Sequence, residues 1–186
     1  AGGLMLACAC AQAAVRMQAA TLTLPGIQLS QVHAEASLGA DGKPVLHIEA
    51  AKASIPALGW RDVALTLQGE PQRANGSAWK FVGHVATQRA PGNALADADV
   101  TLLYDRDGGT LVVDVVQGKS SLNAQLPLDQ PSHLQVKLAA IPLAWLKGVL
   151  AAAWPDGRLN GGMLAGDVAI DLAQDDTRVS GRVSVS

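Results

Sequence analysis

Hydrophobic and polar residues alternate along most of this chain, and a two-residue period is typical of β-strands with one face in contact with water. The stretch GDVAIDLAQDDTRVSGRVSVS, residues 166–186, alternates, turns at 174–177 and alternates again. The stretch DADVTLLYDRDGGTLVVDVVQG, residues 97–118, does the same about a loop at 105–109. Both stretches predict β-hairpins.

Shorter alternating runs fill the rest of the chain. An Asp-Gly turn at 40–43 precedes one of them, and the apolar positions change parity between Leu29 and Val32, which predicts a β-bulge there. The pattern as a whole predicts ten or eleven strands joined mostly by tight turns. The expected fold is therefore all-β and mostly antiparallel, with a strongly curved or groove-forming sheet. Periodicity alone leaves open whether the apolar face is hidden in a sandwich or closed sheet, or lines a groove.

One segment breaks the two-residue period. In IPLAWLKGVLAAAWPDG, residues 141–157, the apolar residues recur at intervals of three and four. Pro142 suits the first position of a helix, and Trp154-Pro155 suits its end. This spacing predicts one short amphipathic α-helix over 142–154.

Composition narrows the class of protein. The chain has 186 residues, 49% of them hydrophobic and only 3% aromatic, so it can form one domain with an aliphatic interior, expected over residues 15–186. The formal net charge is −2, and no block of like charges occurs. Nucleic acid is therefore not an expected partner.

The first fifteen residues, AGGLMLACACAQAAV, resemble the end of a secretory signal, with an apolar run followed by the small-residue pattern Ala11-Gln12-Ala13. We expect residues 1–14 to be a signal-peptide remnant and the protein to be exported. A buried N-terminal segment is the alternative. Cys8 and Cys10 both lie in this stretch, so removal of the signal would leave no cysteine for a disulfide or a zinc site.

Residues that could carry chemistry are scattered. The four histidines have none of the spacings that place two imidazoles on one metal, and they are expected at the surface; they are His33, His47, His84 and His133. Ser132 precedes His133 without a nucleophile elbow. No catalytic, metal or cofactor site is expected, and the protein is not expected to be an enzyme.

Two acidic patterns have plainer explanations. The sequence DRDGG at 105–109 resembles the start of a calcium loop, but a strand follows where further ligands would be needed, so a hairpin turn is preferred. Asp97 and Asp99 could form a carboxylate pair on one side of a strand, or lie in water where that strand begins.

The C-terminal 46 residues resemble a known family. The sequence IPLAWLKGVLAAAWPDGRLNGGMLAGDVAIDLAQDDTRVSGRVSVS, residues 141–186, is similar to the recurring unit of AsmA-like envelope proteins, which include the TamB and YdbH groups. The matching positions are Ile141, Pro142, Leu143, Trp145, Leu146, Leu159, Gly162, Leu164, Gly166, Leu172, Val179, Gly181 and Val183. The resemblance implies a curved, groove-forming sheet in the periplasm whose apolar channel carries phospholipid between membranes, with no cofactor.

These observations favour a non-enzymatic periplasmic module that binds or transports a phospholipid or another acyl-chain ligand. The alternative is a structural or accessory component of an outer-membrane assembly or type II secretion complex, with envelope proteins as partners. The candidate groove residues share one face of the predicted strands, and packing in a closed core is their alternative role. They are Leu46, Ile48, Val63, Leu65, Leu67, Val113, Val115, Val168, Ile170 and Leu172.

Overall fold

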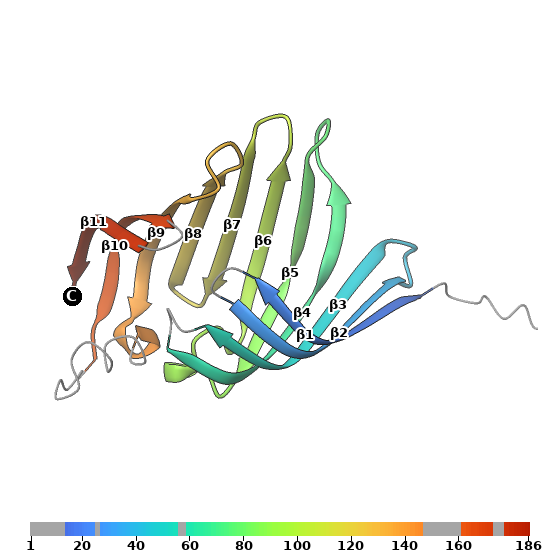
Figure 1. Cartoon of the computed structure of the whole chain (residues 1–186), viewed down its shortest axis with the longest axis horizontal. Helices are drawn as coiled ribbons and strands as arrows, with labels where there is room; N and C mark the ends of the chain where they lie inside the picture. Colours follow the sequence, from blue (N-terminus) through green and yellow to red (C-terminus); the bar gives the residue numbers. More distant parts are fainter. Residues whose placement is uncertain (1–13, 25–26, 56–58, 147–160, 173–176) are drawn as a thin grey trace, which may run out of the picture.

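The structure, a computed structural model, describes residues 14–24, 27–55, 59–146, 161–172 and 177–186. Eleven strands form one antiparallel sheet in which each strand pairs with its neighbours in sequence (Figure 1). The sheet is not closed, and β1 and β11 are its edges. The strands are β1 (Val15–Leu24), β2 (Ile27–Leu38), β3 (Pro44–Ile55), β4 (Trp60–Arg73), β5 (Trp79–Gln88), β6 (Ala98–Asp105), β7 (Thr110–Gln117), β8 (Ser120–Pro127), β9 (His133–Pro142), β10 (Met163–Leu172) and β11 (Thr177–Val185). The all-β, antiparallel prediction is confirmed.

Both predicted hairpins are present. Strands β6 and β7 pair from Asp99 and Val116 to Asp105 and Thr110. In their loop the Gly108 amide donates a hydrogen bond of 2.9 Å to Asp105 Oδ1. The acidic DRDGG sequence is therefore a hairpin turn. Strands β10 and β11 form the second hairpin.

The parity change between Leu29 and Val32 is a bend shared by three strands. Gln31 in β2 and Asp62 in β4 both have φ of +53°. In β3 between them, Ala50 and Ala53 are both buried although they are three residues apart. Pairing of β2 with β3 stays in step across the bend, and the register shifts only between β3 and β4. The predicted bulge in one strand is thus a kink across the sheet, and Figure 1 shows these strands bent along their length.

The α-helix predicted over 142–154 is not found in the described part of this segment. Pro142 is still paired with Met163 in the sheet, and the Leu143 amide donates to the Gly162 carbonyl. Only one turn of 3-10 helix, η3 (Leu143–Leu146), follows. Because sheet pairing extends to Pro142, this residue does not start an α-helix. The rest of the predicted helix falls in residues 147–160, which lie outside the described part of the chain. None of the helical segments described here has the length and apolar character to cross a membrane.

The buried core is small and lies at one end of the sheet. Trp60, Val63, Ala90 and Ala94 form its centre, and Trp145 packs against them. Ala90 and Ala94 flank a second 3-10 turn, η2 (Pro91–Asn93), in the connection between β5 and β6. The core therefore closes one end of a curved sheet and leaves the rest of the same sheet face without a covering layer among the described residues.

Candidate functional site: an apolar groove

Cross-strand pairing arranges apolar residues in rows over one face of the sheet. Leu67 lies opposite Ile48 on one side and Val85 on the other. Val115 lies opposite Val100 and Leu122 in the same way. Residues that pair directly share a sheet face, so these rows form one surface from β3 to β10, which we call the concave face.

The register places all ten predicted groove residues on the concave face. Val63 is fully buried in the core. Leu172 pairs with Thr177, but its side chain lies outside the described part of the structure. The other eight are half-buried: Leu46, Ile48, Leu65, Leu67, Val113, Val115, Val168 and Ile170. Side chains in the centre of a sandwich would be buried, so among the described residues this face is covered by the sheet's own curvature and not by a second layer.

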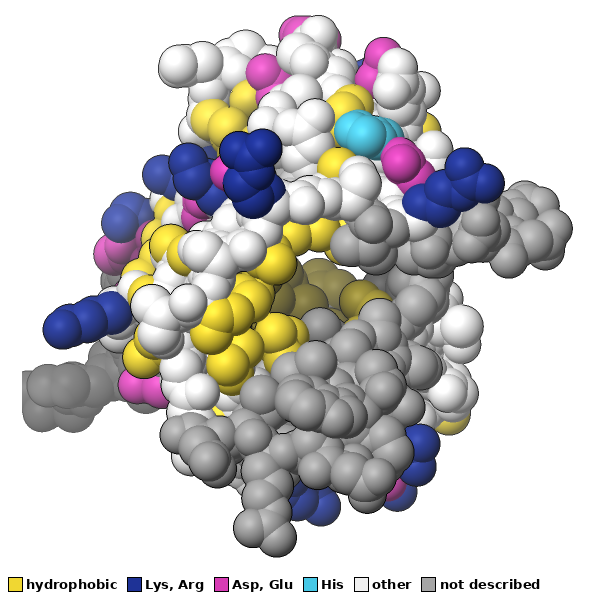
Figure 2. Space-filling model, turned by 90° about the vertical axis from the view of Figure 1, so that its left-hand side faces the viewer, with side chains coloured by type: hydrophobic (Ala, Val, Ile, Leu, Met, Phe, Trp, Pro, Cys, Tyr) yellow, Lys and Arg dark blue, Asp and Glu magenta, His cyan; other side chains and the backbone are white. Residues whose placement is uncertain are grey.

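A cavity of about 400 Å³ lies on the concave face. Predicted residues Val115, Val168 and Ile170 line it from β7 and β10, and Trp60 lines it from β4. Strands so far apart in the sheet can line one cavity only if the sheet curls around it. Figure 2 shows the result, with hydrophobic side chains gathered around a hollow and charged side chains outside it.

The cavity wall is almost entirely apolar, and the side chains of two of its three polar members donate hydrogen bonds to the protein. Gln117 Nε2 donates to the Asn93 carbonyl at 3.2 Å. Ser120 Oγ donates to the Ala140 carbonyl at 2.7 Å. A ligand here would be held by area and shape more than by hydrogen bonds.

The closed end of the cavity comes from two turns that contain none of the predicted groove residues. The connection between β5 and β6 folds inward, where buried Thr87 donates from Oγ1 to the Ala94 carbonyl at 2.6 Å. It packs against η3 so closely that a Cβ on Gly92 would lie 2.5 Å from the Ala144 backbone. These turns bring Leu95 and Trp145 to the cavity. Neither turn has a periodic sequence pattern. The only sequence signal for burial in these turns is therefore that Trp145 and Leu146 are apolar.

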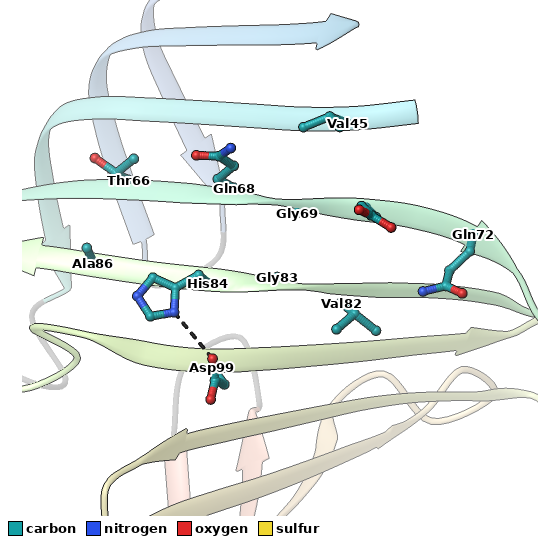
Figure 3. Close-up of a pocket in the computed structure, with 11 residues that line it drawn as sticks. Val45, Thr66, Gln68, Gly69, Gln72, Val82, Gly83, His84, Ala86 and Asp99 are labelled. Carbon is teal, nitrogen blue, oxygen red and sulfur yellow. Dashed lines mark hydrogen bonds and ion pairs between the residues drawn. The ribbon is translucent and has the colours of Figure 1, made fainter. Parts of the chain in front are cut away.

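The opposite, convex face carries mostly polar side chains, with exposed Val82 and Val116 among them. In β5, the His84 ring nitrogens hydrogen-bond to two carboxylates, Nε2 to Asp97 and Nδ1 to Asp99 at 3.3 Å; Figure 3 shows the contact with Asp99. Both carboxylates raise the pKa of His84 above its ordinary value of 6.5, and the hydrogen bond to Asp97 has the largest effect. Asp97 and Asp99 are therefore partners of a histidine, an arrangement that their spacing alone did not reveal. His84 and Asp99 face an open hollow of about 570 Å³ that Gln68 and Thr66 also line.

Other ionic contacts also lie on the convex face. His133 contacts Asp171 at 2.5 Å, His47 contacts Glu49 at 2.9 Å, and Arg16 contacts Glu35 at 3.0 Å. All of these side chains are accessible to water. Within the described ranges, no group of three or more acidic, histidine or cysteine side chains is arranged to hold a metal ion. The convex face is thus a solvated surface that carries several ion pairs.

Comparison with known proteins finds no matching family model, no matching curated protein and no matching solved structure.

Proposed function

We propose that this chain is a non-enzymatic lipid-binding module of a bacterial cell envelope that holds the acyl chain of a phospholipid or related lipid in its concave groove. The observation that carries the proposal is the cavity of about 400 Å³ with an apolar wall, on a sheet face over which the described residues form no second layer. Its volume falls within the range of about 300 to 1,000 Å³ usual for small-molecule sites.

The energetics of such a site favour an acyl chain. Each methylene transferred from water to an apolar wall contributes about 0.8 kcal/mol, so a chain of about ten methylenes gains roughly 8 kcal/mol before the cost of ordering it. Val115, Val168 and Ile170 offer this wall without directional contacts. The lipid can therefore shift along the groove, as a transport module requires.

The cell-envelope location rests on sequence. The segment at 1–14 resembles a secretory signal, and the segment at 141–186 resembles the AsmA-like unit. Export to the periplasm would place an apolar groove in the aqueous space between two membranes, where a lipid in transit needs cover. We therefore place phospholipid transfer between membranes among the proposed roles.

The test is native mass spectrometry of the protein purified from the periplasm of a Gram-negative host, followed by uptake of a fluorescent phospholipid. We expect co-purified lipid and saturable uptake. Protein that is free of lipid and also takes up none of the fluorescent probe would overturn the proposal.

The second candidate is an accessory component of an outer-membrane assembly or type II secretion complex. The sheet edges favour it, because edge strands offer unpaired backbone groups to another chain. Val15 in β1 is 72% exposed and Val185 in β11 is 61% exposed. Crosslinking from these two strands in intact cells should then capture a defined envelope protein, with crosslinking from convex residue Gln125 as the control.

A further inference from the structure

The concave face has one charged residue among its described strand positions. This residue is Arg73, which lies at the end of β4 opposite Trp79 in β5. The Arg73 guanidinium carbon is 5.8 Å from the centre of the Trp79 ring. No carboxylate in the described part of the chain forms an ion pair with Arg73. An apolar groove thus has a single, uncompensated positive charge at one end.

Two exposed aromatic residues lie beside this charge. Trp79 pairs with Tyr104 across β5 and β6, and their exposed fractions are 49% and 38%. Tryptophan and tyrosine have an apolar body and a polar tip, and they are enriched where hydrocarbon meets water. Arg73, Trp79 and Tyr104 therefore form an amphipathic mouth to the groove.

The other end of the groove is closed by Trp60, Trp145 and the two 3-10 turns. Val115 lines the cavity, and Leu111, four residues away along β7, pairs with Tyr104 at the mouth. At a strand rise of about 3.3 Å per residue, the distance from cavity to mouth is about 13 Å. One leaflet of acyl chains is about 15 Å thick, half of a hydrocarbon core of about 30 Å. The span from mouth to cavity therefore fits one acyl chain.

We infer that the groove binds an anionic acyl lipid in a fixed direction, with its head group at Arg73 between Trp79 and Tyr104 and its acyl chain running toward Trp60 and Trp145. The inference rests on the proposed lipid-binding function and adds the charge of the ligand and its orientation. An arginine fork is suited to a carboxylate or phosphate, and Trp79 holds the guanidinium at the mouth.

The experiment compares two probes with the same hydrocarbon chain, cis-parinaric acid and its methyl ester, by their fluorescence on binding. Wild-type protein should bind the acid about tenfold more tightly than the ester, because a charge-assisted hydrogen bond contributes to only one of them. Arg73→Gln should remove this preference without weakening ester binding, and Arg73→Lys should restore part of it. Lys80→Gln is the control, because Lys80 is also exposed but lies on the convex face.

The outcomes separate this inference from the proposed function. If wild-type protein binds acid and ester equally and Arg73→Gln changes neither affinity, the proposed orientation and charge preference are overturned. The lipid-binding groove would remain in place. Absence of binding for both probes would overturn the proposed function as well. An acid preference lost equally in Lys80→Gln would show a non-specific effect of net charge and would also overturn the inference.

Discussion

Gly69 and Gly83 lie directly opposite each other on β4 and β5, and the Phe81 ring covers the space that side chains would occupy. A Cβ on Gly69 would lie 2.5 Å from the Gly83 Cα and 2.6 Å from Phe81 Cζ. Glycines on the inner side of a sheet permit tight curvature, and a neighbouring aromatic ring restores the lost packing. This pair helps to explain how a single sheet can curl around a cavity.

Gly83→Ala should therefore destabilise the fold by about 1 to 3 kcal/mol, because the added methyl group would lie 2.3 Å from the Gln68 carbonyl oxygen. The matched control is Gly39→Ala, where the nearest atom is the Asp41 carboxylate at 3.1 Å, at the end of a flexible side chain. Denaturant unfolding followed by tryptophan fluorescence measures both. Equal stability of the two variants would contradict the role given to the glycine pair.

The closed end of the groove predicts different effects for two tryptophans. Trp60 is 3% exposed in the core, so Trp60→Ala should lower the free energy of unfolding by about 3 to 5 kcal/mol. Trp79 is 49% exposed at the mouth, so Trp79→Ala should lower it by less than about 1 kcal/mol. The same unfolding measurement checks both, and a larger loss at Trp79 would reverse the assignment of closed and open ends.

The His84 cluster predicts a pH dependence of stability. Because Asp97 and Asp99 raise the pKa of His84 in the folded protein, the protonated histidine stabilises the fold. This contribution is full below the unfolded value of 6.5 and is lost as the pH rises through the higher folded value. The side chains are well exposed to solvent, so we expect a change below about 1 kcal/mol.

His84→Gln should abolish this part of the pH dependence. The measurement is the free energy of unfolding of wild type and variant on both sides of pH 6.5, with the difference between them taken at each pH. Other titrating groups cancel in that difference. A difference that grows with rising pH would have the wrong sign for the proposed ion pairs.

The same substitution at two neighbouring residues of β10 should have different effects on ligand affinity. Val168 pairs with Val136 on the concave face and lines the apolar cavity, whereas Ala169 pairs with Gln135 on the convex face and lines only the hollow there. Val168→Asn should weaken binding of a fluorescent fatty acid about tenfold or more, because an amide on the apolar wall must give up water when the ligand covers it. Ala169→Asn should leave the affinity within about twofold. Weaker binding in Ala169→Asn than in Val168→Asn would place the ligand on the convex face and contradict the proposed groove.

Sequence periodicity predicted the strands well because each residue's side of the sheet depends on its immediate neighbours. The hairpin at 97–118 and the common face of Leu46, Val115 and Val168 follow from that local rule. The local rule does not show which face is concave, because the direction of curvature depends on glycine pairs and on the bend shared by β2, β3 and β4. The side chains that close the groove lie in turns far apart in sequence and could not be found from periodicity.

The wrongly predicted helix start at Pro142 and the carboxylate partners of His84 that were not predicted have similar causes. The spacing of apolar residues there is suited to a helix, but sheet pairing through Pro142 and Leu143 determines the local structure. His84 and Asp99 are direct cross-strand partners, and pairing the two predicted strands in register would have joined them. In both cases the missing information was a hydrogen-bonded neighbour from another part of the chain.

The most direct test of the central claim is photocrosslinking with a phospholipid that carries a photoreactive group on its acyl chain, followed by mapping of the modified residues. We expect modification of Val115, Leu138 and Val168, which line the cavity, and little at convex residues such as Gln68 and Gln125. Modification confined to the convex face, or none above the level of unfolded protein, would contradict the claim that the concave face binds lipid.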